Sequence, residues 1–560
     1  MDWTDKYDQP AIVEKTNKFI DQVIDRLHQS KIEVFSGLTR DELALVIRFP
    51  VHVATNIFVE RLLRQYLNRE IYPPATKENK YYNNTVEAVQ SYYYDFSVNY
   101  TLLNQIASVF GAEERAKDVI MPITVKIDQS SFILLKLRNV KKYLLGLRSN
   151  IFMKLMKPVY ICDYSNWMRM FMPASHIFAF DFNPRVKEVD RITRRQIRAV
   201  LTELFLIEID GILSGLHDQE KQFLALIYAE FAEHILPTSL VEGLRPRFSY
   251  YRVLLKDWPV RQLHSFTGFQ YNDNLKIFAV LAKREKAILV GYEHGITNFI
   301  VDHRGFSNEL VFLDYFFSWG VKNSDWLAKG APLANLKIFN FGSPYLGEIK
   351  KWERKAVSPP VFTILYPSGP LLDFMDDLEG ASPEKNRQHR LKVLMMLRAV
   401  LKLFPSAQIL YKPFPGTFAK DPIKDVLAEE LGRGLVKIVY DKPIHYFNQV
   451  DLVLWDTIST GFAESMAAGV PTMVFHSNGE KQQALPLGKM VDGELEKAGI
   501  VFYDIESGLN AFKRIINDRS AISRSESNAV KVFQEALAYP VKRTEFVGQV
   551  EKALNIRMQG

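Results

Sequence analysis

One short segment in the C-terminal half of the chain combines residue types that suit phosphate and hydroxyl recognition. The apolar run Asp451–Trp455 is followed by small and hydroxyl residues that predict a turn into a helix: Thr457, Ser459, Thr460 and Gly461. The start of a helix offers unpaired N–H groups, and small residues let a diphosphate approach them closely. Glu464 lies one turn into this helix, where its carboxylate can accept hydrogen bonds from ribose or sugar hydroxyls. The alternative is a capping turn in which Glu464 only complements the helix dipole.

The ends of three further apolar runs fall where a parallel sheet would place ligand contacts, because ligands of such sheets bind beyond the carboxyl ends of the strands. We expect the amides of Ser368 and Gly369, which follow the run Val361–Tyr366, to contact the distal phosphate. Lys412, the last residue of another run, is expected to neutralise a phosphate, and a solvated strand end is the alternative. A third strand end is expected to hold a nucleotide base through its backbone: Asp441, Lys442 and Pro443.

Another strand end carries the residues best suited to proton transfer. The apolar run Ala287–Tyr292 stops abruptly at Glu293, His294 and Gly295, and we expect the glycine to permit a sharp turn at a crevice. His294 has a pKa suited to a general base near neutral pH, and Glu293 would orient it or stabilise positive charge on the reacting group. Alternatively, His294 hydrogen-bonds the loop backbone and the base lies elsewhere. Two acids are then the next candidates: Asp302 and Asp314.

Two clusters of positive charge are candidate contacts for an acceptor or an anionic membrane. The acid-free segment Phe132–Lys157 carries seven basic residues: Lys136, Arg138, Lys141, Lys142, Arg148, Lys154 and Lys157. Four arginines fall on one face of a predicted helix: Arg191, Arg194, Arg195 and Arg198. Basic residues among apolar ones are typical of a segment at an anionic bilayer surface. A helix with one core face and one solvated face is the alternative for both clusters.

Composition limits the classes of protein that remain. The 560 residues are 47% hydrophobic and 24% charged, which predicts a multi-domain globular chain. The net charge of +7 comes without a nucleic-acid-reading motif, so we expect no nucleic-acid partner. The single cysteine, Cys162, permits no intramolecular disulfide, and neither a secretory signal nor an apolar membrane span stands out. We therefore expect a cytoplasmic protein, peripheral on the inner face of the cytoplasmic membrane, that requires no metal or cofactor.

The order of the predicted elements divides the chain into four parts. Residues 1–157 read as helices, and after them short apolar runs of strand length alternate with helices. This alternation predicts an α/β protein whose parallel sheets are covered on both faces. We expect two Rossmann-like domains that face a cleft, at 158–345 and 346–523. Residues 524–560 are expected to form helices that pack back across that cleft.

Several motifs resemble those of known sugar-transferring enzymes. The segment Asp451–Phe475 resembles the nucleotide-sugar half-site of GT-B glycosyltransferases, in which a Ser/Thr-Gly turn and a Glu precede Ala-x-Gly-x-Pro. Four further motifs lie in the order found in bacterial surface-carbohydrate transferases: Ile235–Gly243, Tyr292–Gly295, Asp314–Gly320 and Ala498–Phe502. More loosely, the layout is similar to that of capsule and teichoic-acid transferases, which use cytidine-activated donors. The chain departs from the family pattern at Glu293–Ile296, where Gln-His-Gly-Gly is expected.

The resemblance implies a GT-B fold and a reaction. The enzyme would transfer a sugar, of hexosyl or ulosonic-acid type, from a nucleotide-activated donor to a surface glycan or a lipid-linked acceptor. The first Rossmann-like domain would carry the acceptor and the general base, and the second would bind the nucleotide-sugar as a substrate. Two alternatives stay open: a nucleotide-sugar epimerase or hydrolase on the same fold, and a catalytically silent scaffold of a glycan-assembly complex.

Overall fold

The computed structural model describes the greater part of both expected sheet domains. The described residues are 9–57, 160–163, 168, 172, 176–178, 180, 189–212, 217–256, 258, 260–296, 310, 312–320, 336–353, 361–369, 383–414, 421–476, 486–517 and 529–556. The basic segment Phe132–Lys157, with Lys141 and Lys142, lies outside these residues, and so does Asp302.

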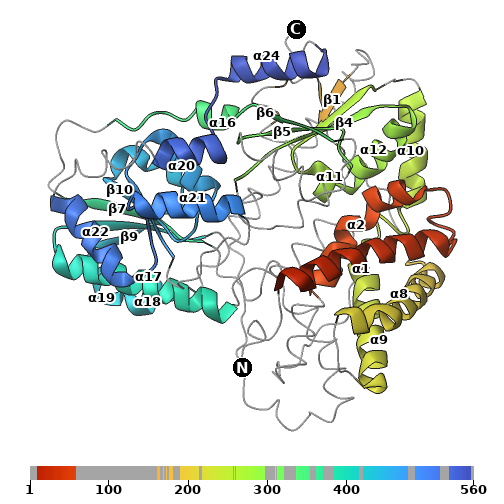
Figure 1. Ribbon diagram of the computed structural model, residues 1–560, viewed down its shortest axis with the longest axis horizontal. Helices are drawn as coiled ribbons and strands as arrows, with labels where there is room; N and C mark the ends of the chain where they lie inside the picture. Colours follow the sequence, from red (N-terminus) through yellow and green to blue (C-terminus); the bar gives the residue numbers. More distant parts are fainter. Residues whose placement is uncertain are drawn as a thin grey trace.

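The C-terminal half contains a parallel sheet of six strands, on the left of Figure 1, in the order β12-β11-β10-β7-β8-β9. The strands are β7 (Thr363–Pro367), β8 (Gln408–Lys412), β9 (Val436–Ile438), β10 (Leu452–Trp455), β11 (Thr472–Phe475) and β12 (Val501–Phe502). The first three strands extend the sheet in one direction and the last three in the other. The order therefore reverses between β7 and β10, and a crevice at the carboxyl ends of these two strands is where doubly wound sheets bind ligands.

Helices cover both faces of this sheet. They are α17 (Pro383–Leu403), α18 (Ile423–Val426), α19 (Ala428–Gly432), α20 (Thr460–Ala468), α21 (Pro486–Lys497) and α22 (Ile505–Asn517), with short 3₁₀ turns η6 (Pro443–His445) and η7 (Phe447–Gln449). Alternate strand residues point to opposite faces. On β10, Leu454 joins the core cluster beneath α17 and α22, whereas Val453 and Trp455 join the cluster around α20. Gly469 ends α20 in the left-handed conformation, with a φ of 77°.

The first sheet is also parallel and six-stranded, in the order β2-β1-β3-β4-β5-β6. Its strands are β1 (Tyr160–Asp163), β2 (Ile177–Phe178), β3 (Gln262–Ser265), β4 (Ile288–Tyr292), β5 (Tyr315–Ser318) and β6 (Lys337–Asn340). The described helices of this part are α8 (Arg191–Ile212), α9 (Asp218–Ile235), α10 (Leu244–Lys256), α11 (Gly268–Tyr271) and α12 (Asp273–Arg284). Two six-stranded parallel sheets in succession confirm the predicted α/β class with two Rossmann-like sheets.

Strand β3 is absent from the sequence prediction because its four residues are polar enough to hide the strand pattern. All four are buried, and His264 makes hydrogen bonds with Tyr292 (2.8 Å) and Gln262 (3.1 Å). Burial lowers the pKa of His264 to about 3, so the ring is neutral at pH 7. Hydrogen bonds to Tyr292 on the neighbouring strand β4 and to Gln262 on β3 itself allow the polar side chain of His264 to be buried in the core.

The two faces of the first sheet pack against different parts of the chain. Leu289 of β4 belongs to the core on the side of α10 to α12, whereas Val290 lies in a cluster with Phe546 and Val550. The last two residues belong to helix α24 (Arg543–Leu554), which lies above the first sheet in Figure 1. The C-terminal helix of the chain thus completes the first sheet domain rather than the second.

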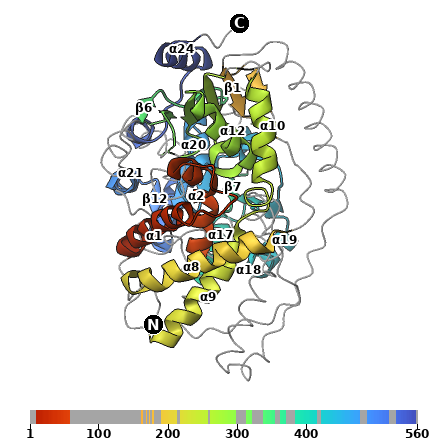
Figure 2. The same ribbon diagram turned by 90° about the vertical axis from the view of Figure 1, so that its right-hand side faces the viewer.

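Helices α1 (Gln9–Gln29) and α2 (Arg40–Ile57) pack on α8, α9 and α12 (Figure 2). Phe19 of α1 makes edge-to-face contacts with Phe205 and Tyr228, and their apolar residues share one core cluster with the first sheet. Along the described ranges, no helix combines the length and hydropathy needed to cross a membrane.

The connection between the two sheets runs along helix α20. After β6, helix α16 (Pro344–Gly347) contacts both α20 and α24. Beyond it, the amide of Trp352 donates to the carbonyl of Ala468 at 2.7 Å, and Nζ of Lys351 donates to the carbonyl of Ala467 at 2.8 Å. The connection therefore satisfies carbonyl groups that the end of α20 leaves unpaired.

Candidate functional site

The turn after β10 places the start of α20 at the carboxyl edge of the second sheet. Ser459 is the N-cap residue, with extended backbone (φ −132°, ψ 177°), and its side chain makes no capping hydrogen bond. The first N–H groups of α20 thus receive no side-chain cap from Ser459, whereas a simple capping turn would use its hydroxyl. Thr457, Ser459 and Thr460 are all half-buried. The arrangement suits an anion at this helix end.

Gly461 has a packing role that the sequence did not predict. A Cβ at this position would lie 2.3 Å from the Trp455 ring. The indole of Trp455 in turn donates to the hydroxyl of Ser465 at 3.2 Å. Glycine is therefore needed here so that the first turn of α20 can pack on Trp455. The close approach of a diphosphate to this backbone stays a prediction.

The turn after β4 in the first sheet meets this helix start. A Cβ placed on Gly295 would lie 2.8 Å from Oγ1 of Thr460. Gly295 does not have a positive φ, so it is the close approach of Thr460, and not a left-handed turn, that requires glycine. The predicted catalytic turn and the predicted phosphate-binding turn are thus adjacent.

His294 and Glu293 differ sharply in their surroundings. Glu293 is fully buried, and its Oε2 accepts hydrogen bonds from the Ser318 hydroxyl (2.8 Å) and the Trp319 amide. Burial raises the pKa of Glu293 to about 8, although the two hydrogen bonds act to lower it. His294 is half-buried, and its Nδ1 has no hydrogen-bond partner in the described structure. Burial lowers the pKa of His294 to about 4, below the near-neutral value expected from the sequence. Glu293 thus ties β4 to β5, and His294 is the better placed of the two for contact with a substrate.

Glu464 faces the connection between the sheets. Its Oε1 accepts a hydrogen bond of 2.6 Å from the Tyr345 hydroxyl on α16. Burial raises the pKa of Glu464, while the bond from Tyr345 and the positive charge of Lys442 oppose this rise. The residue does more than complement the helix dipole, since it links three separate segments of the chain.

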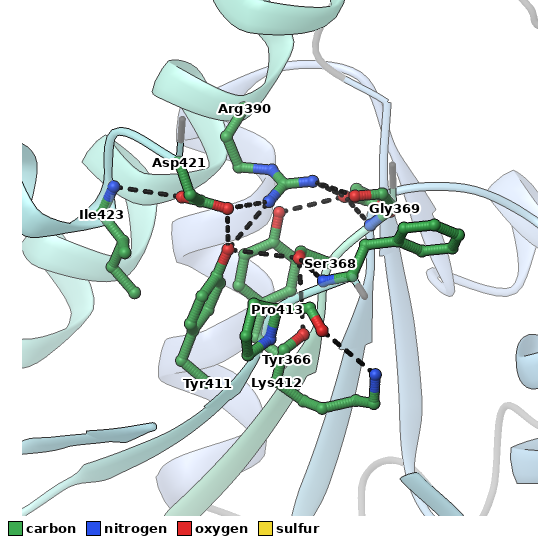
Figure 3. A network of polar contacts seen from close by, with 11 residues as sticks. Tyr366, Ser368, Gly369, Arg390, Tyr411, Lys412, Pro413, Asp421 and Ile423 are labelled. Atoms are coloured by element: carbon green, nitrogen blue, oxygen red, sulfur yellow. Dashed lines mark hydrogen bonds and ion pairs between the residues drawn. The ribbon is translucent and has the colours of Figure 1, made fainter. Parts of the chain in front are cut away.

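The amides of Ser368 and Gly369 are not available to a phosphate as predicted. The Ser368 amide donates to the Lys412 carbonyl at 3.0 Å, and the Gly369 amide donates to the Asp456 carboxylate at 2.9 and 3.1 Å. Both amides are therefore used within the protein. The Ser368 hydroxyl similarly accepts hydrogen bonds from Tyr411 and from the amide of Phe414 (Figure 3).

A buried charged network holds this edge of the sheet together, and no local sequence pattern marks it. Arg390 of α17 lies between Asp421 (2.8 Å) and Asp456 (3.2 Å), and all three are buried. The guanidinium also donates to the carbonyl of Gly369 at 2.7 Å and to the hydroxyl of Tyr411 at 2.9 Å (Figure 3). Buried charges require such compensation. Arg390 and Asp456 together clamp both polar groups of the Gly369 backbone.

Lys412 keeps the position and charge expected of a phosphate contact. Its Nζ donates to the carbonyl of Pro413 at 3.1 Å, and no described carboxylate forms an ion pair with it. Burial lowers the pKa of this half-buried amine.

Among the residues predicted to hold the base, Asp441 and Lys442 are exposed and Pro443 begins η6, which contacts α20.

The four arginines of α8 do not form one surface. Arg194 is buried, where it pairs with Glu242 at 2.8 Å and donates to the carbonyl of Leu236 at 2.6 Å, so it is not available to an acceptor or a membrane. Arg198 pairs with Glu233. Arg191 and Arg195 are exposed.

In the described ranges, no group of three or more histidine, cysteine or acidic residues is arranged to hold a metal ion.

Comparison with solved structures gives distant likenesses. The chain is similar to S. aureus MnaA solved with UDP (11% identity over 56% of this chain and 80% of that one, TM-score 0.34). It is similar to the UDP-GlcNAc 2-epimerase of Methanocaldococcus jannaschii (13% identity over 52% of this chain and 82% of that one, TM-score 0.33). It is also similar to S. aureus TarM in a complex containing UDP (13% identity over 56% of this chain and 58% of that one, TM-score 0.35). No curated protein matches the chain. The model of the LIC12162 family of transferases matches residues 56–520. The chain therefore belongs to the LIC12162 transferase family.

Proposed function

We propose that this transferase moves a sugar from a nucleotide-activated donor to a surface glycan or a lipid-linked acceptor. The observation that carries the proposal is the contact between the two sheets at Gly295 and Thr460. It sets a histidine of one domain beside a helix N-terminus of the other. Group transfer from a phosphate leaving group needs these two elements: a base for the acceptor and positive potential for the departing charge.

On the donor side, the start of α20 would bind the diphosphate. Its N–H groups carry partial positive charge, and Lys412 would neutralise a phosphate oxygen from the end of β8, which β7 separates from β10. Glu464 would accept hydrogen bonds from ribose or sugar hydroxyls. The nucleotide base would lie near the exposed Asp441 and Lys442, which directly precede η6, a turn that contacts α20.

On the acceptor side, His294 would take the proton. The acceptor oxygen attacks the anomeric carbon and forms the new C–O bond, while the bond from that carbon to the phosphate oxygen breaks and the nucleotide leaves with the electron pair. The hydroxyl proton passes to His294, which is neutral at pH 7 because burial lowers its pKa to about 4. The negative charge of a bound diphosphate would raise this pKa and make the imidazole a stronger base.

The exposed part of α8 would contact an anionic membrane that carries the acceptor. Arg191 and Arg195 are exposed beside large apolar side chains: Ile192 (73% exposed), Leu226 (55%) and Leu206 (37%). Arg195, Leu206 and Leu226 also line one surface groove. Basic and apolar residues together favour anionic bilayers. Binding to anionic but not to neutral liposomes, lost in high salt, would support this contact, and binding to neither would contradict it.

The experiment that tests the proposal has two stages. Thermal-shift screening with uridine, cytidine, guanosine and thymidine nucleotides first identifies the donor base. The matching nucleotide-sugars are then incubated with and without glycan or lipid-linked acceptors, and nucleotide release is measured. Release that depends on the acceptor supports transfer. Equal release without an acceptor indicates a hydrolase, and the absence of nucleotide binding indicates a scaffold.

A further inference from the structure

Helix α20 is held by the segment that joins the two sheets at three points along its length. The hydroxyl of Tyr345 reaches Glu464 in the second turn of the helix. Lys351 and the amide of Trp352 reach the carbonyls of Ala467 and Ala468 at its end. The helix expected to bind the donor is therefore fixed to the interdomain connection rather than to its own sheet alone.

Tyr345 is itself held in place from the first sheet domain. Helix α16 begins at the N-cap Ser343, whose hydroxyl accepts from the amide of Leu346 at 3.2 Å. The amide of Ser343 donates to the carbonyl of Tyr539 at 2.8 Å, and the hydroxyl of Tyr539 donates to the carbonyl of Asn340 at 2.8 Å. The tyrosine thus stands on a short helix with a capped start, tied to β6 and to the C-terminal segment.

We infer that Tyr345 is a positioning residue for Glu464, which holds one carboxylate oxygen so that the other is presented to the donor. This inference rests on the proposed function. Oε1 of Glu464 accepts the bond from Tyr345 at 2.6 Å, and in the described structure Oε2 has no hydrogen-bond partner. A carboxylate on a long side chain loses rotamer freedom when one oxygen is fixed before binding. The donor then meets an acceptor group that is already oriented.

The same contact adjusts the ionisation of Glu464. A hydrogen bond to the charged form favours that form, and the bond from Tyr345 opposes the rise in pKa that burial causes. Lys442 acts in the same direction through its charge. Of the other segments that contact α20, η6 carries the exposed His445 and β11 has no titratable residue. The turn after β4 carries His294 at the start of the helix, and the interdomain connection carries Lys351 at its end. Removal of the Tyr345 hydroxyl should therefore raise the pKa of Glu464.

The test compares Tyr345→Phe with Tyr228→Phe in the full-length protein. Each variant loses one phenolic hydroxyl that makes a side-chain hydrogen bond, but the Tyr345 hydroxyl reaches Glu464, whereas that of Tyr228 bonds Thr55 of α2 at 3.0 Å. We expect Tyr345→Phe to weaken the binding of the nucleotide-sugar found by thermal shift about threefold to tenfold, the range for one hydrogen bond. The pH below which donor affinity falls should also move upward. Tyr228→Phe should change neither quantity.

Two further variants separate this inference from the proposed function. In Glu464→Gln the amide oxygen still accepts from Tyr345 but no longer titrates, so Tyr345→Phe in this background should weaken affinity without shifting its pH dependence. If Glu464→Ala weakens donor binding while Tyr345→Phe leaves affinity and pH dependence unchanged, the positioning role is wrong and the donor site stands. If Glu464→Ala also binds normally, the proposed donor site itself is wrong.

Discussion

Gly295 and Thr460 follow strands of two different sheets, yet they lie against each other. A Cβ atom placed on Gly295 would be only 2.8 Å from Oγ1 of Thr460. This contact brings the histidine turn of the first domain to the helix start of the second. It is also the point at which a side chain one carbon larger should disturb both domains at once.

The Gly295→Ala variant should therefore lose stability through its contact with Thr460. Inserting a methyl group into a packed contact costs about 1–3 kcal/mol. Because the obstacle is a side-chain hydroxyl, Thr460→Ala should relieve part of the cost, with a coupling of at least about 0.5 kcal/mol between the two changes. The free energy of unfolding of both single variants and the double variant measures this. Strictly additive effects would mean that the two turns are not in contact.

His294→Ala should reduce turnover with donor and acceptor by roughly 10²–10⁴-fold, the usual contribution of a general base. Donor affinity should stay within a few-fold of the wild type, since the diphosphate is expected to bind the other domain. His28→Ala, which removes an exposed imidazole on α1, is the matched control and should keep full turnover. Wild-type turnover in His294→Ala would show that another residue is the base. Asp314 is excluded from that role, because it precedes β5 and accepts a hydrogen bond from the Leu289 amide at the start of β4, at the opposite edge of the sheet from His294.

Arg390→Ala should destabilise the protein strongly, because it leaves Asp421 and Asp456 buried without their cation. Breaking a buried ion pair costs about 3–5 kcal/mol. Arg433, at the end of α19, pairs with Glu429 where both side chains are more than half exposed (59% and 65%), so Arg433→Ala should cost at most about 1 kcal/mol. Chemical denaturation of the two variants gives the comparison. Equal costs would show that the Gly369 loop does not depend on the buried network.

Glu293 should make stability depend on pH in the direction opposite to that of a salt-bridged acid. Its pKa rises from 4.5 to about 8 on folding, so the folded chain binds the proton more tightly. The contribution of protonated Glu293 to the free energy of unfolding is fully present below pH 4.5. It is lost as the pH rises toward 8, and the loss amounts to roughly 5 kcal/mol in total. Glu293→Gln keeps an oxygen that can accept from Ser318, and it should lose this part of the pH dependence in denaturation curves. If Glu293→Gln kept the same pH dependence of stability, the ionisation of Glu293 would not be its cause.

The sequence predicts those strands, turns and helices whose residues are contiguous in the chain. The strand β10, its turn and α20 are contiguous in sequence, and the apolar run followed by hydroxyl residues indicates all three. Arg390 and Asp456 are far apart along the chain, so only the folded sheet reveals that they share a buried network. Likewise, helical spacing groups Arg194 with Arg191, but the position of Glu242 decides that Arg194 is buried.

The amides of Ser368 and Gly369 illustrate the same limit. Their place after β7 follows from the apolar run, but their partners, the Lys412 carbonyl and the Asp456 carboxylate, lie on neighbouring strand ends that only the sheet order brings together. The hydrogen bond between Tyr345 and Glu464 crosses between the domains and has no signature in either segment.

Calorimetric titration of the nucleotide-sugar into the wild type and Glu464→Ala tests the central claim most directly. The account places donor hydroxyls against this carboxylate, and hydrogen bonds to a charged group contribute about 1.5–3 kcal/mol. The variant should therefore bind the donor about tenfold more weakly or worse while it remains folded, with a melting temperature lowered only by the loss of the hydrogen bond from Tyr345. Wild-type affinity in a normally folded Glu464→Ala protein would contradict the assignment of α20 as the donor site.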